Sequence, residues 1–211
     1  MSATSPVIRV VDDDAAFRTA ISRLLRAAGY EVRAYASAGD FLLADEDSSP
    51  GCLLLDLKMP GPDGLDLQAA LSKRAKALPI LFLTAHGDVA ASVRAMKGGA
   101  EDFLTKPVKR ETLLGGIRAA LARDAELRAV REQIQQTRER FEALSPRERL
   151  VLEQVAAGRL NKQIASAIGA SERTVKAHRA RVMAKMGASS VADLVRAADR
   201  VARAAPSPRS R

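Results

Sequence analysis

Acidic, hydroxyl and basic side chains follow short apolar runs at four places in the first half of this 211-residue chain. In chain order they are Asp12, Asp13, Asp14, Asp56, Thr84 and Lys106. Two or three neighbouring carboxylates could hold a hard cation such as Mg²⁺. A carboxylate can also act as a nucleophile and form an aspartyl-phosphate, whose oxygens accept hydrogen bonds from hydroxyl and ammonium groups. Together these residue types indicate phosphoryl chemistry supported by a divalent cation.

An alternation of predicted strands and helices places those side chains at one edge of a sheet. Continuous apolar runs such as 53–55 are typical of buried parallel strands, and their alternation with helices predicts an α/β fold. In such a sheet, ligands bind at the carboxyl ends of the strands, so the polar residues are expected to converge there. The strands are expected at 7–11, 31–35, 52–55, 80–83 and 102–104, and the helices at 17–28, 37–46, 64–77, 88–98 and 109–122.

The positive charge of the chain is concentrated in its second half. The formal net charge is +9; residues 1–125 hold 16 Lys and Arg against 16 Asp and Glu, whereas residues 126–211 hold 18 against 9. Such an asymmetry indicates two domains, of which the second faces a polyanion such as nucleic acid. A solvated basic face or a basic tail would carry the same charge, so charge alone leaves both interpretations open.

A long connector helix is expected between the two halves. The stretch from Glu111 to about Arg140 favours helix and contains no proline, although Gly115-Gly116 is a weak point near its start. Asp124 and Arg131 fall where a coiled-coil heptad needs apolar residues. We therefore favour a partly exposed connector helix over a stable coiled coil.

The last segment reads as four short helices with clear start and stop signals. The third is basic, and its apolar residues Val175, Val182 and Met186 stand on one face. A short helix, a turn with glycine and a basic helix make a helix-turn-helix arrangement. The four helices are expected at 146–158, 161–168, 172–186 and 191–203.

Composition excludes several classes of protein. The chain is 47% apolar and 28% charged, which is ordinary globular composition. No apolar run approaches the roughly 18 residues that span a bilayer, and the N-terminus lacks the pattern of a signal peptide. Cys52 stands alone and cannot form an internal disulfide or a cysteine-based zinc site. We expect a soluble cytoplasmic protein with no membrane partner and with Cys52 in the core.

Residues 7–122 resemble a response-regulator receiver domain. The resemblance implies a doubly wound, flavodoxin-like sheet of five parallel strands, phosphorylated on Asp56 by a sensor histidine kinase. It also implies that Asp12 and Asp13 hold Mg²⁺, with Asp56 and the backbone carbonyl of Lys58 as further ligands. The motifs that carry it are Val-Val-Asp12-Asp13-Asp14, Leu-Asp56-Leu-Lys-Met-Pro60, Leu-Thr84-Ala-His-Gly and Thr-Lys106-Pro107.

The same resemblance assigns roles around the phosphoacceptor. Lys106 pairs with the phosphoryl oxygens, Thr84 moves toward them, and Phe103 is the aromatic switch that turns inward with Thr84. Lys58 and His86 stand where family members tune the lifetime of the phosphoryl group. Without the family pattern, Phe103 reads as a core residue and His86 as an exposed loop residue.

Residues 142–200 resemble a LuxR-type DNA-binding domain. The motifs that carry this resemblance are Leu144-Ser-Pro-Arg-Glu-Arg, Val155-Ala-Ala-Gly158, Asn161-Lys-Gln-Ile-Ala165 and Ser171-Glu-Arg-Thr-Val-Lys176-Ala-His178-Arg. It implies that the helix at 172–186 enters the major groove of double-stranded DNA and that the helix at 191–203 dimerises. Lys176, Ala177 and Ala180 would face base edges. Lys162, Thr174, His178, Arg179 and Arg181 would mainly meet the DNA backbone, and Arg173 is a further expected contact residue.

Together the two halves resemble a FixJ-like response regulator. The resemblance implies that phosphorylation promotes a homodimer, which binds a specific DNA site and regulates transcription, with activation and an RNA polymerase partner expected. A regulator of this kind is not an enzyme. The corresponding domains are a receiver at 1–123, a helical linker at 124–141, a DNA-binding domain at 142–205 and a disordered tail at 206–211.

Two other functions compete with this interpretation. An aspartyl-phosphate phosphatase or transferase could use the same carboxylates, but the sequence shows neither a substrate pocket nor a second acid/base carboxylate near Asp56. The basic helices would also be unexplained. A DNA-binding scaffold that ignores phosphorylation would leave Asp56 as a relic, which the intact set of acidic, hydroxyl and lysine residues argues against.

Overall fold

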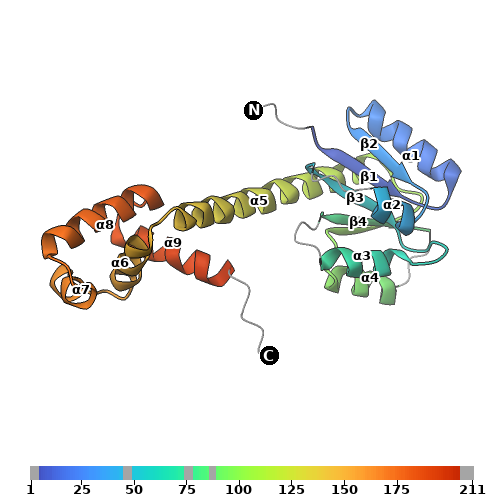
Figure 1. The fold of residues 1–211 in the computed structure, drawn as a ribbon. Helices are drawn as coiled ribbons and strands as arrows, with labels where there is room; N and C mark the ends of the chain where they lie inside the picture. The colour runs from blue at the N-terminus through green and yellow to red at the C-terminus, as the bar shows by residue number, and fades with distance from the viewer. Residues whose placement is uncertain (1–4, 45–48, 74–77, 86–88, 205–211) are drawn as a thin grey trace. The chain divides into compact units, whose positions relative to one another are not determined.

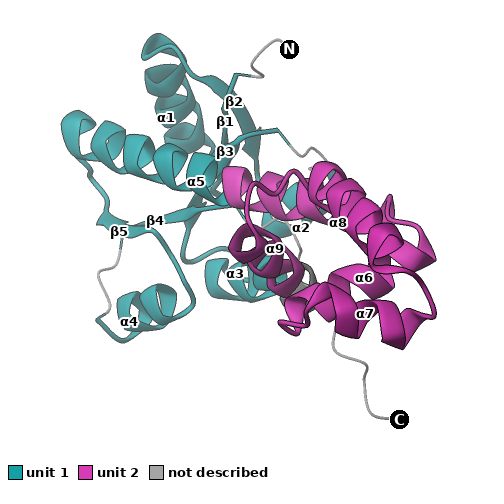
Figure 2. Ribbon diagram, turned by 90° about the vertical axis from the view of Figure 1, so that its left-hand side faces the viewer, with its two compact units in different colours: residues 1–127 teal, residues 128–211 magenta. Residues whose placement is uncertain are grey.

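The protein divides into two compact units, residues 1–127 and 128–211 (Figure 2). The computed structural model describes residues 5–44, 49–73, 78–85 and 89–204, and Figure 1 labels their helices and strands. His86 and the predicted disordered tail at 206–211 lie outside the described residues. Each unit has a hydrophobic core of its own.

Unit 1 alternates strands with helices in the predicted order. Its strands are β1 (Val7–Val11), β2 (Glu31–Tyr35), β3 (Gly51–Asp56), β4 (Ile80–Thr84) and β5 (Asp102–Thr105). Its helices are α1 (Ala15–Ala27), α2 (Ala38–Ala44), α3 (Gly64–Ser72), α4 (Val89–Lys97) and the first part of α5 (Arg110–Glu142).

The helix predicted over 64–77 is shorter in the structure. α3 ends at Ser72, and Lys73 is its C-cap residue. The last large apolar side chain that α3 buries is Leu71. The rest of the predicted helix, residues 74–77, lies outside the described residues.

The five strands form a parallel sheet in the order β2-β1-β3-β4-β5. In its register Val11 lies opposite Leu55, and Leu55 lies opposite Phe82. β1 pairs with β2 on one side and with β3 on the other, so the strand order reverses there. Open α/β sheets bind ligands at the carboxyl ends of the strands beside such a reversal. The predicted doubly wound fold is confirmed.

Alternate residues of each strand pack on opposite faces of the sheet. Leu53 and Leu55 belong to the core cluster that α2, α3 and α4 cover, whereas Cys52 and Leu54 belong to the cluster that α1 and α5 cover (Figures 1 and 2). β3 is buried along its whole length. Burial raises the pKa of the Cys52 thiol to about 12, so this cysteine is an unreactive core residue.

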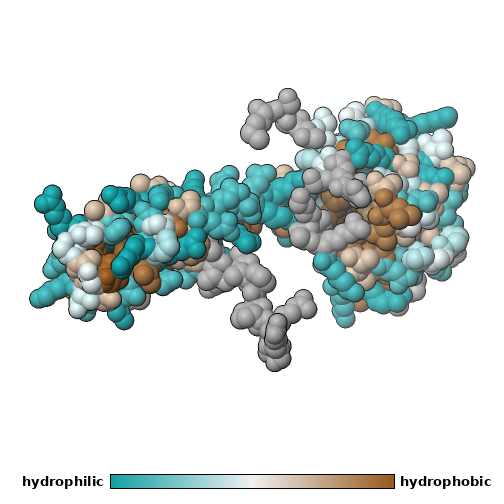
Figure 3. All heavy atoms as spheres, viewed as in Figure 1, coloured by the Kyte–Doolittle hydropathy of each residue, from teal (hydrophilic) through white to brown (hydrophobic). Residues whose placement is uncertain are grey.

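α5 runs without a break through the two glycines near its start. A Cβ atom at Gly116 would lie 2.9 Å from Leu81 Cδ2, so glycine lets α5 pack closely against β4. The fully buried Leu113 and Ile117 complete this contact side. Farther along, the surface of α5 is mainly hydrophilic (Figure 3), and Val130 is 55% exposed. Neither α5 nor any other helix among the described residues is long and apolar enough to cross a bilayer.

Asp124 fastens α5 to the opposite end of the sheet from the acidic site. Its side chain is buried, and Oδ2 accepts the N–H of Gly51, the first residue of β3, at 2.9 Å. The polar residue that interrupts the heptad pattern is therefore a tertiary contact of unit 1, because a buried backbone N–H needs an acceptor.

Unit 2 contains the end of α5 and the helices α6 (Pro146–Ala156), α7 (Asn161–Ile168), α8 (Glu172–Met186) and α9 (Val191–Ala204). Ser145 and Glu148 form a capping box at the start of α6. The C-cap residues of α7 and α8 are Gly169 and Gly187, each in the left-handed conformation with φ +64°. α6 ends two residues earlier than predicted, at Ala156. Ala157 is its C-cap residue, and the N–H of Ala157 donates to the carbonyls of Glu153 and Val155.

The core of unit 2 lies between these helices. Val175, Val182 and Met186 of α8 are buried together, as their spacing predicts. Leu152 of α6 and Ile164 of α7 belong to the same cluster. α8 is therefore held by one apolar stripe, and its other sides are available for polar contacts.

Candidate functional site

The carboxyl ends of β1, β3 and β5 bring three predicted site residues into contact. Lys106, which follows β5, donates from Nζ to Asp12 Oδ2 at 2.6 Å and to Asp56 Oδ2 at 2.8 Å. Only 2% of Asp12 and 8% of Asp56 is exposed. Because buried carboxylates are stable only with compensating partners, the ammonium group of Lys106 is the centre of this site.

The three consecutive aspartates after β1 have different partners. Asp12 Oδ1 accepts the N–H of Asp14 at 2.9 Å. Asp14 in turn is the N-cap of α1, and the N–H groups of Phe17 and Ala16 hold the pKa of its carboxyl below the usual value. Asp13 is exposed. The helix therefore engages Asp14 and leaves Asp12 and Asp13 for the site.

Three carboxylates at this edge are suited to a divalent cation. One oxygen each from Asp12, Asp13 and Asp56 lies within 4.8 Å of the others. Mg²⁺ and Ca²⁺ both prefer carboxylate oxygens. Burial raises the pKa of Asp12 even though Lys106 acts against it. A bound cation would favour the charged form of Asp12, so the acidic cluster is compatible with a divalent-cation site.

The pKa of Lys106 is raised above its usual value. Burial of the ammonium group acts to lower it, but the hydrogen bonds and charges of Asp12 and Asp56 outweigh that effect. Lys106 therefore remains protonated, and can donate hydrogen bonds, over the whole physiological pH range.

Three further predicted residues lie beside this cluster. Thr84 is buried at the end of β4, and its carbonyl accepts the N–H of Lys106 at 2.7 Å. Phe103 is half-buried on β5, with its ring centroid 6.1 Å from that of Phe82. Lys58 donates its N–H to Asp56 Oδ1 at 3.3 Å and exposes its side chain.

The second predicted site lies on α8 and the neighbouring α7. Ser171 caps α8, and its side chain accepts the N–H of Thr174 at 3.1 Å. Such a basic helix with a free solvent side suits a polyanion. Two of the predicted contact residues, His178 and Arg179, are half-buried. The others are exposed: Lys162, Arg173, Thr174, Lys176, Ala177, Ala180 and Arg181.

One predicted contact residue also joins the two helices. Arg179 Nη1 donates to Oδ1 of Asn161, the first residue of α7, at 2.8 Å. Because this bond links residues 18 positions apart, it holds α7 and α8 in a defined relative orientation. Local spacing carries no signal for such a contact, and the role of Asn161 was not expected.

Comparisons with known proteins identify both regions. Residues 8–118 match the family model of the response regulator receiver domain, and residues 142–198 match that of the bacterial regulatory proteins of the luxR family. This chain is a response regulator. It belongs to the response regulators that join a receiver domain to a LuxR-type DNA-binding domain. The regulator is 43% identical to nodulation protein W of Bradyrhizobium diazoefficiens over 195 residues, which are 92% of this chain and 86% of that protein.

Two solved structures are similar to that of the response regulator. The structure of response regulator StyR has a TM-score of 0.81 at 42% identity and covers 92% of this chain and 98% of that one. Full-length FixJ from B. japonicum has a TM-score of 0.57 at 43% identity and covers 95% of this chain and 98% of that one. The receiver fold and the C-terminal helical domain are therefore confirmed.

Residues that the sequence motifs do not include support the acidic site of the response regulator. Arg18 donates from Nη1 to the carbonyl of Asp12 at 2.6 Å. Lys106 Nζ lies 4.1 Å from the ring centroid of Phe17, a cation–π contact. A Cβ atom at Gly64 would lie 2.3 Å from the carbonyl oxygen of Asp56, so only glycine lets α3 begin there. The turn-forming run Pro60–Gly64 is the one sequence signal that points to this approach.

Proposed function

We propose that a sensor histidine kinase phosphorylates Asp56 and thereby switches this response regulator to a DNA-binding homodimer. The observation that carries the proposal is the nearly buried Asp56 carboxylate, bonded to Lys106 beside two further carboxylates. In the reaction, a carboxylate oxygen attacks the phosphorus of a phosphohistidine. The new P–O bond forms as the P–N bond breaks, and the imidazole nitrogen leaves and takes up a proton.

The residues around Asp56 divide the remaining tasks. Asp12, Asp13, Asp56 and the backbone carbonyl of Lys58 are the proposed ligands of Mg²⁺, which when bound offsets the charge of the phosphoryl group. On phosphorylation, Lys106 replaces its hydrogen bond to Asp56 with one to a phosphoryl oxygen. Its second bond, to Asp12 at 2.6 Å, keeps the ammonium group in place during this exchange.

Thr84 and Phe103 are the proposed switch. The Thr84 hydroxyl moves to donate to a phosphoryl oxygen, and the ring of Phe103 turns into the space that this movement leaves. The half-buried position of Phe103, packed at the edge of a core cluster, is compatible with such a turn. Lys58, exposed two residues after Asp56, and His86 would tune the lifetime of the acyl phosphate by controlling the approach of water.

Exposed apolar side chains on α4 support the proposed dimerisation. Val89, Val93 and Met96 are 76%, 45% and 48% exposed. A group of large apolar side chains on the surface is typical of an interaction site. We assign the receiver dimer to the face of α4 and β5, and a second contact between copies to α9. Two linked DNA-binding domains then bind DNA more tightly than either alone.

α8 is the proposed recognition helix. Lys176, Ala177 and Ala180 would read base edges in the major groove, and the exposed position of all three supports this. RNA polymerase is the proposed partner in transcription, and the cytoplasm the proposed location. The residues proposed to contact mainly the DNA backbone are Lys162, Thr174, His178, Arg179 and Arg181, and Arg173 is a further proposed contact.

The proposed function divides the chain in four. The receiver comprises 1–123, the helical linker 124–141, the DNA-binding domain 142–205 and the tail 206–211. α5 contains all of 124–141 as continuous helix, which supports the helical character of the proposed linker, and Asp124 at its start is held within unit 1 by Gly51.

Sedimentation velocity with Mg²⁺, before and after treatment with acetyl phosphate, tests the proposal. The wild-type protein is expected to shift from monomer to dimer, whereas Asp56→Asn stays monomeric because its amide is not a nucleophile. Asp14→Asn is a matched control: it also removes a carboxylate near the site, but Asn preserves the helix cap, so this variant should dimerise. A wild-type protein that does not shift, or an Asp56→Asn protein that does, contradicts the proposed switch.

A further inference from the structure

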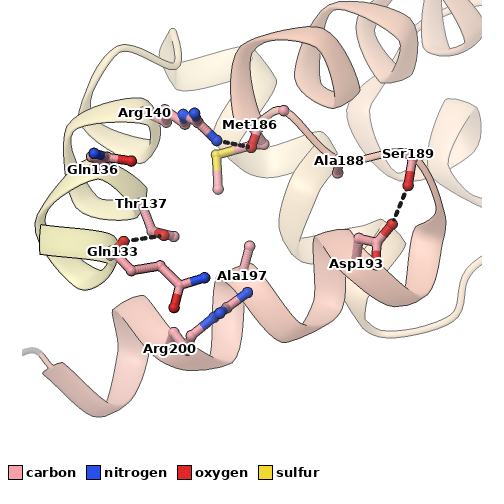
Figure 4. A pocket seen from close by; sticks show the side chains of 11 residues that line it. Gln133, Gln136, Thr137, Arg140, Met186, Ala188, Ser189, Asp193, Ala197 and Arg200 are labelled. Carbon is pink, nitrogen blue, oxygen red and sulfur yellow. Dashed lines mark hydrogen bonds between the residues drawn. The ribbon is translucent and has the colours of Figure 1, made fainter. Parts of the chain in front are cut away.

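The C-terminal ends of α5 and α8 hold each other through reciprocal hydrogen bonds within unit 2. Arg140, in the last turn of α5, donates from Nη1 to the carbonyl of Met186, the last residue of α8, at 3.3 Å (Figure 4). Lys185 of α8 donates from Nζ to the carbonyl of Ala143, which follows α5, at 3.2 Å. Each helix end thus receives a cation where its carbonyls lack helical partners and its dipole is negative. We call Arg140, Ala143, Lys185 and Met186 the helix-end clasp.

A polar network around the start of α6 supports the clasp. Lys185 Nζ also donates to Glu148 Oε2 at 2.7 Å, and the same oxygen accepts the N–H of Ser145 at 2.8 Å. Lys185 and the N–H of Ser145 lower the pKa of Glu148, which is 3% exposed, to about 2. Arg149 adds a bond from Nη2 to the carbonyl of Glu142 at 2.9 Å. The end of α5 is therefore part of the structure that holds α8.

Gly187 allows the close approach of Arg140. It ends α8 with φ +64°, and a Cβ atom there would lie 2.6 Å from Arg140 Nη1. Gly169 ends α7 with the same φ but has open space around the corresponding Cβ position. A cavity of about 370 Å³ adjoins the clasp, and Arg140 and Arg200 are among its lining residues (Figure 4). Because Arg140 has this space beside it, its hydrogen bond rather than dense packing holds the guanidinium at Met186.

We propose that the helix-end clasp positions α8 for specific DNA binding, so that Arg140 is a positioning residue and not a DNA contact. The inference rests on the proposed role of α8 as the recognition helix. The proposed contacts on α8 lie within 173–181, whereas the clasp holds the C-terminal end of that helix. Base-edge contacts require a defined helix orientation, whereas phosphate contacts tolerate small tilts. Loss of the clasp should therefore reduce specific binding more than non-specific binding.

Two arginines of α5 provide a matched pair of variants. Arg140→Met removes the donor to Met186 and keeps an apolar stem. Arg138→Met removes the same charge two residues earlier, where the exposed Arg138 pairs with Glu142 of its own helix at 2.9 Å. Full-length protein treated with acetyl phosphate and Mg²⁺ would be titrated with two duplexes at several salt concentrations. One is a duplex that the wild type selects from a random library, and the other is its scrambled counterpart.

Arg140→Met is expected to bind the selected duplex up to about tenfold more weakly than Arg138→Met, because the loss of one charge-assisted bond lowers the population of the binding-competent orientation. Binding to the scrambled duplex, and the slope of affinity against salt, should match the control. Arg140→Lys, which returns a cation to the end of α8, should restore part of the specific affinity. Hydrogen exchange of the last turn of α8, without DNA, should be faster in Arg140→Met than in Arg138→Met.

Three results would overturn the inference. Equal specific affinity of the two variants means that the clasp does not position α8. A weaker salt dependence, by about 0.9 in slope, means that Arg140 contacts a phosphate. An equal loss on both duplexes with unchanged slope means that the variant is merely less folded. A wild-type protein that selects no duplex contradicts the proposed function instead, and the hydrogen-exchange comparison still decides whether the clasp holds α8.

Discussion

The acidic site of unit 1 and the basic face of unit 2 are built in opposite ways. In unit 1, Lys106 bonds to Asp12 and Asp56, which are 94 and 50 positions away in the sequence. In unit 2, the basic side chains between Arg173 and Arg181 lie on one helix, and helical periodicity alone separates them from the buried stripe. The acidic site therefore requires the complete sheet, whereas the basic face requires only that one stripe of α8 be buried.

The charged side chains at the centre of the acidic site are largely buried, whereas most of those on the basic face are exposed. Asp12 and Asp56 are almost inaccessible to water, whereas Lys176 and Arg181 are exposed. Buried charges interact strongly and are little affected by salt, whereas exposed charges are screened. Single substitutions should therefore have large effects in unit 1 and graded, salt-dependent effects in unit 2.

The largest contrast is expected between two lysines that each bond to a buried carboxylate. Lys106→Met should lower the free energy of unfolding of unit 1 by roughly 3 kcal/mol, because it leaves Asp12 and Asp56 without their cation. Lys185→Met should cost less, because the side chain of Lys185 is 42% exposed and Glu148 keeps the N–H of Ser145.

The two units can be followed separately in that experiment. Both tyrosines, Tyr30 and Tyr35, lie in unit 1 and the chain has no tryptophan, so tyrosine fluorescence during urea unfolding reports unit 1. Hydrogen exchange followed by mass spectrometry reports unit 2. An equal loss of stability in the two variants would show that burial does not distinguish the two lysines.

Two glycines sharpen the comparison at the level of the backbone. Gly64→Ala should cost roughly 1 to 3 kcal/mol of unfolding free energy, since its Cβ would lie 2.3 Å from the Asp56 carbonyl and 2.9 Å from Phe82 Cε1. Gly169→Ala should cost about 1 kcal/mol, since only its left-handed backbone opposes a side chain. Urea unfolding measures both. The reverse order would mean that α3 shifts easily away from the end of β3.

A smaller, salt-dependent effect is expected on the basic face of α8. Arg181→Gln should weaken binding to specific and scrambled duplexes by the same factor and reduce the slope of log affinity against log salt by about 0.9, because it removes one proposed phosphate contact. Fluorescence anisotropy at several salt concentrations measures both quantities. Arg138→Gln, which removes an exposed charge outside this face, is the control. An unchanged slope in Arg181→Gln would exclude a phosphate contact at this residue.

The smallest effects are expected in how stability changes with pH, and they should have opposite signs at Asp12 and at Glu148. The folded-state pKa of Asp12 is raised above 3.8, so its contribution to stability is present below that value and lost as the pH rises through the folded pKa. Asp12→Asn should therefore be more stable than wild type at pH 7 in a chelator, and this gain should shrink on acidification.

The contribution of Glu148 to stability should change with pH in the opposite direction. Its folded-state pKa is about 2 against an ordinary 4.5, so its contribution is present above pH 4.5 and lost as the pH falls toward 2. Glu148→Gln should be less stable than wild type at pH 7, and this loss should shrink below pH 4.5. Urea unfolding at pH 7 and pH 3.5, followed in unit 1 for Asp12→Asn and in unit 2 for Glu148→Gln, measures the two differences. A shared sign would contradict the opposite electrostatic environments of the two carboxylates.

Local signals predicted the elements of both units and the residues at most of their ends. Ser145 and Ser171 cap α6 and α8 as their positions predict, and Gly169 and Gly187 are the C-cap residues of α7 and α8. Such signals act through hydrogen bonds between residues three or four positions apart. The same reasoning made the helix at 64–77 too long, because its end depends on where packing against other elements stops.

The acidic site was also predictable in its parts, because strand ends in a parallel sheet converge whatever the details of their loops. The hydrogen bonds between the residues of the site were not predictable. Nothing near Lys106 in the sequence indicates that one ammonium bonds to both Asp12 and Asp56, and nothing near Arg18 places it against the carbonyl of Asp12. Asp124 is similar: it reads as a surface residue of a connector and is buried against Gly51.

The order of the elements, the apolar faces and the edge of the sheet at which chemistry can occur were thus readable from the residues alone, because these follow from periodicity and from bonds between near neighbours. Which charge bonds to which, and where only glycine fits, depends on the folded chain. Lys106, Arg140 and Arg179 each donate to acceptors that are distant in the sequence, and only the folded chain brings those acceptors within bonding distance.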